Sequence, residues 1–247
     1  MQNILLKSLS IILWIWFLLS SILFTPVILL LWLFTFWWDK KLRVVHLFSC
    51  FWGAQYIWVN PLWKLKIIDR KKFDDSKAYI IISNHQSLVD IIVIYSIFKH
   101  FRWTSKVENF RLPFVGWVLS LNRSVKVYRN KPEAYKLFRK TAEKTYDQGS
   151  SLMIFPEGTR SRDGNLNRFK EGAFFLAHDL KADILPMVLD GTSKAIPKTG
   201  WSLRGKQRMQ LKVLDPVPYD EFSELSIKET GLKFRELIGN ELQKLRK

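Results

Sequence analysis

A long uncharged segment near the start of the chain limits what this sequence can fold into. Ser8 to Trp38 contains no charged residue. A continuous helix of that length would measure roughly 45 Å, whereas the hydrocarbon core of a bilayer is about 30 Å thick. We therefore predict that this segment lies in a membrane, and that it is too long for one upright span.

The segment is interrupted by Ser20-Ser21 and then by Pro26, which disfavours helical backbone at Thr25. Two helices that meet between Ser20 and Pro26 would each be about 20 Å long, too short to cross a bilayer. This pattern predicts a hairpin that dips into one leaflet, and a single tilted or kinked span is the main alternative. A cleaved signal peptide is disfavoured, because the run is long and no small-x-small cleavage site follows it.

A second apolar and aromatic segment, Val44 to Trp63, is predicted to form a membrane-adjacent helix that ends at Pro61. Eight of the 11 tryptophans lie at or before Trp63, and tryptophan favours the headgroup boundary. The positive-inside rule places the flanking cations, which we expect to form one basic collar, on the cytoplasmic side. The collar consists of Lys40, Lys41, Arg43, Lys64, Lys66, Arg70, Lys71 and Lys72. Residues 1–63 are therefore predicted to anchor a separate domain, residues 64–247.

The composition restricts the ligands and cofactors. Among the 247 residues, 39 Lys and Arg outnumber 22 Asp and Glu, which gives a net charge of +17. Such a surface suits nucleic acid, anionic lipid or a phosphorylated substrate, and general solubility is the alternative. Cys50 is the only cysteine, so no internal disulfide can form. Neither zinc-site spacing nor a glycine-rich nucleotide loop occurs, so no metal or other cofactor is predicted.

Beyond residue 77 the pattern changes to short apolar runs that alternate with amphipathic segments. Strands are predicted over residues 78–82, 124–128, 151–155, 184–189 and 210–214, and helices over 87–98, 131–148 and 169–180. Apolar residues from Phe234 to Leu245 form one face of a C-terminal helix. Alternating strands and helices predict an α/β fold with a central, mostly buried mixed sheet flanked by helices.

Two polar clusters follow predicted strands. His85 and Asp90 lie five residues apart, and a turn into a helix after His85 would bring the carboxylate back to the imidazole. Asp90 would then fix the tautomer, and His85 could take a proton from a substrate hydroxyl. A capping or core role is the alternative for this pair taken by itself.

The second cluster is Phe155-Pro156-Glu157-Gly158-Thr159-Arg160-Ser161. Gly158 allows close approach of a ligand, Thr159 can donate a hydrogen bond, and Arg160 offers a fork matched to phosphate. Glu157 could bind a substrate hydroxyl or pin the loop. A turn closed by a salt bridge is the alternative for this string.

Together these clusters resemble the phospholipid/glycerol acyltransferase superfamily, in particular its bacterial 1-acyl-glycerol-3-phosphate acyltransferases of the PlsC type. Asn84-His85 and Asp90 fit the superfamily's Asn-His-x4-Asp signature, and the Glu-Gly-Thr-Arg motif follows in the right order. The resemblance extends from about residue 77 to residue 191, with matches between the motifs at Lys106, Pro113, Gly116 and Trp117. Tyr128 stands where the family commonly has Asp, and Asn122-Arg123 stands where a glycine and a small residue are usual.

The resemblance implies a membrane-bound enzyme at the cytoplasmic face of a bacterial inner membrane. His85 and Asp90 would be catalytic, and no cofactor would be needed. The motif residues Glu157, Gly158, Thr159 and Arg160 would form the binding site for the acceptor and its phosphate, in which Arg160 holds the phosphate. Lys106, Arg129 and Lys170 would be further substrate-binding residues. Solvated surface cations are the alternative for Lys106 and Arg129.

The expected reaction moves an acyl chain from acyl-CoA or acyl-carrier protein to the sn-2 hydroxyl of lysophosphatidic acid and makes phosphatidic acid. Another acceptor, such as glycerol-3-phosphate or a different lysophospholipid, is the nearest alternative. A non-catalytic binder of anionic lipid or nucleic acid is a second alternative, although we predict no nucleic-acid partner. A lipid hydrolase is disfavoured, because no Gly-x-Ser-x-Gly motif occurs.

Overall fold

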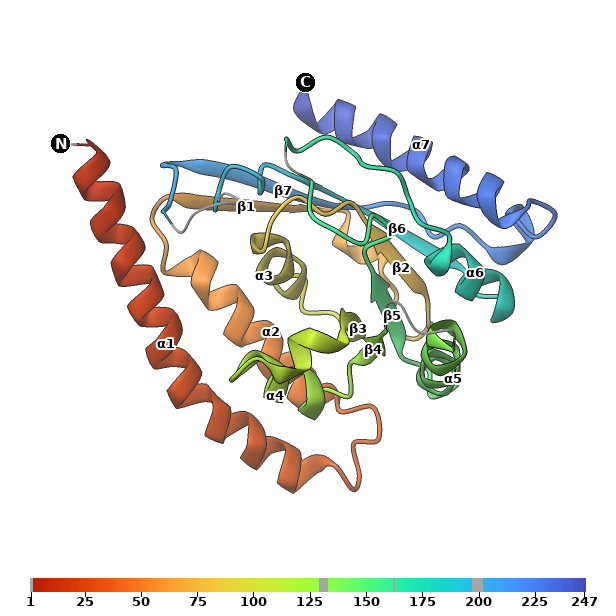
Figure 1. Cartoon of the computed structure of the whole chain (residues 1–247), viewed down its shortest axis with the longest axis horizontal. Helices are drawn as coiled ribbons and strands as arrows, with labels where there is room; N and C mark the ends of the chain where they lie inside the picture. The colour runs from red at the N-terminus through yellow and green to blue at the C-terminus, as the bar shows by residue number, and fades with distance from the viewer. Residues whose placement is uncertain (1, 129–132, 162, 197–201) are drawn as a thin grey trace.

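The computed structural model describes residues 2–128, 133–161, 163–196 and 202–247 (Figure 1). The strands are β1 (Trp63–Ile68), β2 (Ile80–Ser83), β3 (Phe101–Lys106), β4 (Val125–Val127), β5 (Ser151–Ile154), β6 (Ile184–Asp190) and β7 (Gln207–Val213). The α-helices are α1 (Gln2–Thr35), α2 (Arg43–Trp58), α3 (Val89–Tyr95), α4 (Val115–Leu121), α5 (Ala134–Asp147), α6 (Gly172–Asp179) and α7 (Ile227–Arg246). Short 3-10 helices are η1 (Arg70–Lys72), η2 (Val107–Arg111) and η3 (Tyr219–Glu221).

These strands form one seven-stranded sheet in the order β1-β7-β6-β2-β5-β3-β4. Neighbouring strands are parallel except β6 and β7, which pair antiparallel. The predicted mixed sheet is therefore confirmed. Strand β2 lies at the centre, where Ile81 joins one apolar core cluster while Ile80 and Ile82 join the other. Both faces of this strand are buried, so its side chains are apolar on both sides.

Helices cover the two faces of the sheet (Figure 1). On one face, Cys50 of α2 and Val93 of α3 belong to the same cluster as Ile81. On the other face, Phe138 of α5, Phe174 of α6 and Phe234 of α7 form the second cluster. The strands and helices predicted beyond residue 77 are present, with ends that differ by a few residues. Lys131 and Pro132, at the predicted start of α5, lie outside the described residues.

The predicted break between Ser20 and Pro26 is wrong, because α1 continues through both positions. Pro26 removes one backbone donor, yet hydroxyls in this stretch donate to backbone carbonyls. Ser21 Oγ donates to the Phe17 carbonyl and Thr25 Oγ1 to the Ser21 carbonyl, each at 2.6 Å. These bonds add to the helix around Pro26, and the packing of Phe24 and Ile28 against α2 holds the same stretch. Among the described helices, α1 between Ile4 and Thr35 is the one long and apolar enough to cross a membrane.

A two-helix motif does form, but the chain turns after α1 and returns as α2 (Figure 1). The rings of Phe24 and Trp52 meet edge to face with centroids 5.7 Å apart. Ser20 Oγ and Tyr56 OH lie 2.6 Å apart across the two helices. Helix α2 in turn packs on the sheet. Helix α1 therefore lies outside α2, along the folded domain, and most of its large apolar side chains are exposed.

The cations of the predicted basic collar lie on different elements, and Arg43 Nη2 donates to the Asp75 carbonyl, which follows Arg70–Lys72 of η1. Lys40, Lys41 and Arg43 lie at the turn between α1 and α2, whereas Lys64 and Lys66 lie on the edge strand β1. Helix α2 separates the two groups by about 24 Å, the length of its 16 residues. Lysines on an edge strand discourage pairing with the strand of another molecule. This role explains Lys64 and Lys66 without a contact to lipid.

Candidate active site

The candidate site begins where β2 ends in the centre of the sheet. Asn84 is buried in the loop that follows, and its carboxamide pairs with the backbone of β6. Asn84 Nδ2 donates to the Leu189 carbonyl and the Leu189 N–H donates to Asn84 Oδ1, both at 2.8 Å. These two bonds replace strand pairing beyond the end of β2. They fix the loop that carries His85 against its neighbouring strand.

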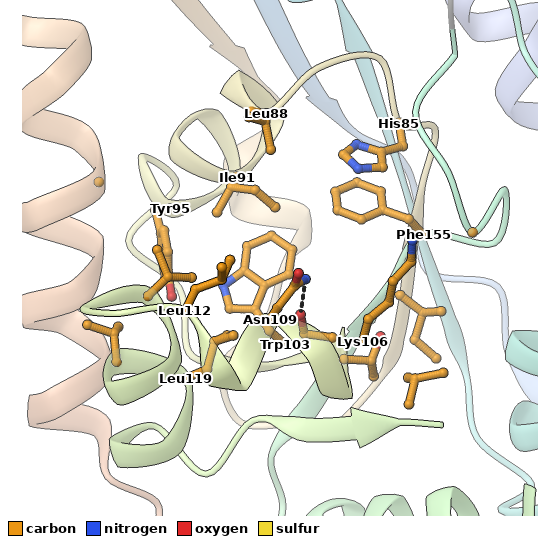
Figure 2. Close-up of a pocket in the computed structure, with 18 of the residues that line it drawn as sticks. His85, Leu88, Ile91, Tyr95, Trp103, Lys106, Asn109, Leu112, Leu119 and Phe155 are labelled. Atoms are coloured by element: carbon orange, nitrogen blue, oxygen red, sulfur yellow. Dashed lines mark hydrogen bonds between the residues drawn. The ribbon is translucent and has the colours of Figure 1, made fainter. Parts of the chain in front are cut away.

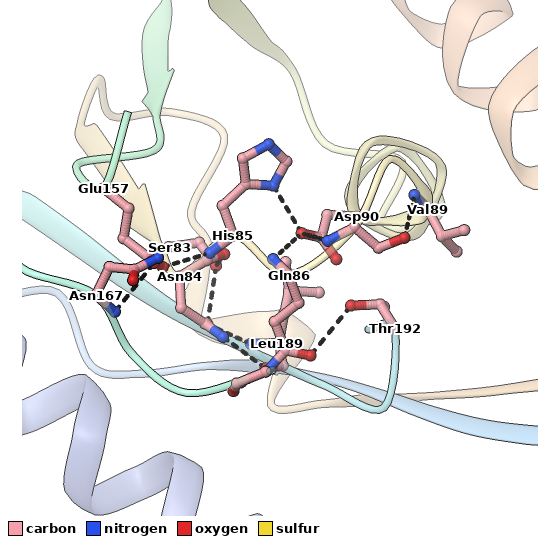
Figure 3. A network of polar contacts seen from close by, with 12 residues as sticks. Ser83, Asn84, His85, Gln86, Val89, Asp90, Glu157, Asn167, Leu189 and Thr192 are labelled. Carbon is pink, nitrogen blue, oxygen red and sulfur yellow. Dashed lines mark hydrogen bonds and ion pairs between the residues drawn. The ribbon is translucent and has the colours of Figure 1, made fainter. Parts of the chain in front are cut away.

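His85 and Asp90 form the predicted pair (Figure 3). His85 Nδ1 lies 2.7 Å from Asp90 Oδ2, and the backbone N–H groups of Gln86 and Ser87 donate to the same oxygen at 2.6 and 2.9 Å. Asp90 is fully buried in the first turn of α3. A carboxylate can only accept, so the proton of the neutral imidazole sits on Nδ1. Nε2 is then the nitrogen that can take up a proton from a substrate.

Glu157 joins this loop to the Glu-Gly-Thr-Arg loop after β5 (Figure 3). Its Oε1 accepts from the His85 backbone N–H at 2.7 Å. Its Oε2 accepts from the Asn167 backbone N–H at 3.1 Å and from Asn167 Nδ2 at 2.6 Å. The side chain is buried, and this burial raises its pKa although the hydrogen bonds oppose the shift. Of the two predicted roles for Glu157, the geometry matches the pinning of the loop.

Two further contacts hold His85 in place. The Ser161 N–H donates to the His85 carbonyl at 2.8 Å. The ring of Phe155 stacks on the imidazole, with centroids 3.9 Å apart and planes 11° apart. The imidazole is thus held from its backbone, its Nδ1 and one ring face, while it still lines the adjoining pocket.

This pocket has a volume of about 930 Å³ and is mostly apolar (Figure 2). Residues of α1 to α4, such as Trp52, Ile92 and Val118, form its walls on one side, and Phe138 of α5 and Ala173 of α6 line the other. A long apolar space beside a proton acceptor suits a ligand with an acyl chain.

The structure gathers some of the predicted ligands around this pocket. Lys106, Gly158 and Lys170 line it. Gly158 has a φ of +66°, and a Cβ there would lie 3.2 Å from the Lys170 side chain, so glycine suits this close approach. Thr159 and Arg160 follow in the same loop, with Thr159 exposed and Arg160 partly buried. Arg129 lies outside the described residues.

Reasoning from the sequence did not single out Asn167, Ser105 or Asn109. Asn167 completes the partners of Glu157 from ten residues away. Ser105 and Asn109 line the pocket, where Asn109 Nδ2 donates to Ser105 Oγ at 2.9 Å (Figure 2). Single asparagines and serines are common throughout proteins, so no pattern marked these three. Within the described ranges, no group of three His, Cys, Asp or Glu residues is placed to hold a metal ion.

Known proteins share the family and the fold of this chain. A family model described as Acyltransferase matches residues 64–190. The crystal structure of the 1-acyl-sn-glycerophosphate acyltransferase PlsC from Thermotoga maritima superimposes with a TM-score of 0.84. That alignment covers 100% of this chain and 98% of the other, at 23% sequence identity. The predicted α/β fold with its apolar N-terminal helix is thereby confirmed.

Curated relatives have a higher sequence identity over shorter aligned stretches. The chain is 34% identical over 154 residues to the chloroplastic 1-acyl-sn-glycerol-3-phosphate acyltransferase LPAT1 of Arabidopsis thaliana, covering 62% of this chain and 42% of that protein. It is 31% identical over 173 residues to the 1-acyl-sn-glycerol-3-phosphate acyltransferase of Helicobacter pylori, covering 66% and 73%. The chain thus spans less than half the length of the plant protein. By both the family model and these relatives, it belongs to the acyltransferase family.

Proposed function

We propose that this protein transfers an acyl chain from an acyl thioester to the sn-2 hydroxyl of 1-acyl-glycerol-3-phosphate and so forms phosphatidic acid. The observation that carries the proposal is the 2.7 Å contact between His85 Nδ1 and Asp90 Oδ2 at the wall of a long apolar pocket. The matched relatives that are named 1-acyl-sn-glycerol-3-phosphate acyltransferases support the choice of acceptor.

In the proposed reaction, His85 Nε2 takes the proton of the acceptor hydroxyl as its oxygen attacks the thioester carbonyl. The buried carboxylate of Asp90 stabilises the imidazolium that forms. Collapse of the tetrahedral intermediate breaks the C–S bond, and the imidazolium returns the proton to the departing thiolate. The nucleophile belongs to the substrate, so no acyl-enzyme is needed. Acyl-CoA and acyl-carrier protein are both suitable donors.

Cations near the pocket are proposed to hold the acceptor phosphate. Lys106 and Lys170 line the pocket on the side of the Glu-Gly-Thr-Arg loop, and Arg160 belongs to that loop. Guanidinium and ammonium groups are the usual partners of phosphate. The apolar surface of α1 supports seating of the domain in one leaflet, and we place that leaflet on the cytoplasmic face of the membrane.

The proposal is tested by thiol release and product analysis with detergent-purified protein, acyl-CoA and lysophosphatidic acid. His85→Ala should abolish phosphatidic acid formation, while His178→Ala, which removes a histidine of α6 bonded to Thr230, should retain it. Arg160→Ala should raise KM for the phosphorylated acceptor more than it lowers kcat. Substantial activity in His85→Ala would refute the mechanism.

The same assay separates the alternatives. If product forms with glycerol-3-phosphate or another lysophospholipid and not with lysophosphatidic acid, the proposed acceptor is wrong and the proposed reaction type still holds. Acyl-carrier protein should be tested as donor in parallel with acyl-CoA. Failure with every donor and acceptor would favour a non-catalytic lipid binder.

A further inference from the structure

A short stretch that spans the η2–α4 connection and the first turn of α4 exposes large apolar side chains beside α1. Leu112, Val115 and Trp117 are 50%, 40% and 52% exposed. The opposite side of α4 packs inward, since Val118 and Leu121 contact the apolar cluster that α1 and α2 share. Helix α4 therefore has one face against the N-terminal helices and one face that is apolar and uncovered. Clustered exposed apolar residues mark an interaction surface more strongly than scattered ones do.

The backbone holds this stretch in its outward position. The Val115 N–H donates to the Pro113 carbonyl at 2.6 Å, and Phe114 between them has φ +59° and ψ −59°. These values describe the rare, strained form of the γ-turn. Gly116 packs so closely on η2 that a Cβ there would lie 2.2 Å from the Phe110 carbonyl oxygen. Strain of this kind persists only where the surroundings enforce it, so the exposure of these side chains is built into the fold.

Charge identifies the kind of partner. Arg111 and Arg123 flank the exposed stretch, and both are exposed. From Asn109 to Pro132 the sequence contains no acidic residue. An apolar centre with a cationic rim matches the surface of a bilayer that contains anionic lipid. The stretch also adjoins α1, whose own apolar side chains are exposed.

We infer that Leu112 to Trp117 is a second membrane contact, distinct from α1, which inserts at the headgroup boundary of an anionic leaflet. Leu112 also lines the pocket that contains His85 (Figure 2), and so do Phe114 and Val115. This contact therefore places one wall of the pocket against the leaflet. A lysophospholipid acceptor can then enter sideways from the leaflet, a consequence that rests on the proposed function, whereas the contact itself does not.

The contact can be measured directly, because Cys50 is the only cysteine and is buried. On a Cys50→Ala background, one cysteine is placed at Trp117, at Leu19 of α1 or at Leu232 of α7. All three positions are occupied by large apolar residues, 52%, 53% and 58% exposed, and α7 lies on the opposite side of the sheet from α1 (Figure 1). Each variant is labelled with an environment-sensitive fluorophore. It is then reconstituted into nanodiscs of phosphatidylglycerol and phosphatidylcholine with brominated acyl chains.

Bromine should quench the label at position 117 nearly as strongly as at position 19, and the label at position 232 should not be quenched. Equal, weak quenching at 117 and 232 would overturn the inference. A label at 117 that is shielded from both bromine and aqueous iodide would overturn it too, because a second copy or another protein would then cover the stretch. The readout needs no turnover, so a failed acyl-transfer assay would leave it intact, and the reverse also holds.

Discussion

Replacing Asp90 by asparagine separates the charge of this residue from its orienting role. One oxygen of Asp90, Oδ2, accepts all three hydrogen bonds, from His85 Nδ1, Gln86 N and Ser87 N. The other oxygen, Oδ1, is buried and has no partner among the described residues. An asparagine can place its carbonyl oxygen where Oδ2 lies and its NH2 group where Oδ1 lies. All three hydrogen bonds and the imidazole tautomer are then kept, and the negative charge is lost.

The size of the expected decrease in kcat follows from the positive charge that the imidazole carries in the transition state. A hydrogen bond between charged groups contributes about 1.5–3 kcal/mol, and this contribution is largest when the imidazolium has formed. Its loss corresponds to a decrease in kcat of roughly 10- to 150-fold for Asp90→Asn. Asp90→Ala instead leaves three donors without an acceptor and releases the imidazole. We expect a decrease of roughly 1,000-fold or more in that variant.

The assay is thiol release at saturating donor and acceptor for wild type, Asp90→Asn, Asp90→Ala and His85→Ala. The new NH2 group of Asp90→Asn is a buried donor without a partner, which costs about 1–3 kcal/mol of stability. Melting midpoints are therefore needed for each variant, and rates are compared well below the lowest midpoint. If folded Asp90→Asn is as inactive as His85→Ala, the separation of charge from orientation is refuted. Equal rates for Asp90→Asn and Asp90→Ala would show that the three hydrogen bonds do not orient the base.

Three further predictions concern stability and the loop after β5. Gly116→Ala should lower the free energy of unfolding by about 1–3 kcal/mol through overpacking, whereas Gly172→Ala, with no atom within 4 Å of its Cβ, should not. Thermal melts compare the two. Burial lowers the pKa of His100 to about 2 and that of the neighbouring His46 to about 3, so wild type should lose stability as pH falls below about 6.5, by up to about 1.4 kcal/mol per pH unit for each histidine. His100→Gln should reduce that slope by about half in melts between about pH 7 and pH 5. Glu157→Gln turns an NH2 group toward a backbone donor, so kcat should fall with KM for the acceptor nearly unchanged, the opposite of Arg160→Ala in the same steady-state assay.

The central strands and the contact between His85 and Asp90 could be predicted because their signals are local. β2, β5 and β6 are short apolar runs, and burial on both faces of a sheet dictates that composition. The pairing of His85 with Asp90 requires one turn of chain, and the donors to Asp90 all come from residues 85–87. Neither feature depends on a distant segment, so sequence spacing predicts the strands and the contact. The choice of a catalytic role over a capping role needed the resemblance to the acyltransferase superfamily.

Strands β1 and β3 were not predicted, because charged residues interrupt them. In β1, Lys64 and Lys66 alternate with apolar residues at the edge of the sheet. Because further cations follow in the sequence, these lysines were assigned to a basic segment and not to a strand. β3 carries Arg102, which is 3% exposed. Its guanidinium donates to the carbonyls of Lys41 and Asn122, which come from the α1–α2 turn and the end of α4. These acceptors are distant in the chain, and no local pattern reveals that an arginine will be buried against them.

Contacts between segments that are distant in the chain also relate the two sequence motifs of the site. Read separately, the Asn-His-x4-Asp motif supplies a base and the Glu-Gly-Thr-Arg motif supplies phosphate ligands. In the structure the second motif also holds the first, because Glu157 accepts from the His85 N–H and the Ser161 N–H donates to the His85 carbonyl. Phe155, at the start of the same loop, covers one face of the imidazole. A ligand that moves this loop would therefore also move His85, so under the proposed function we expect acceptor phosphate binding and proton transfer to be linked through residues 155–161.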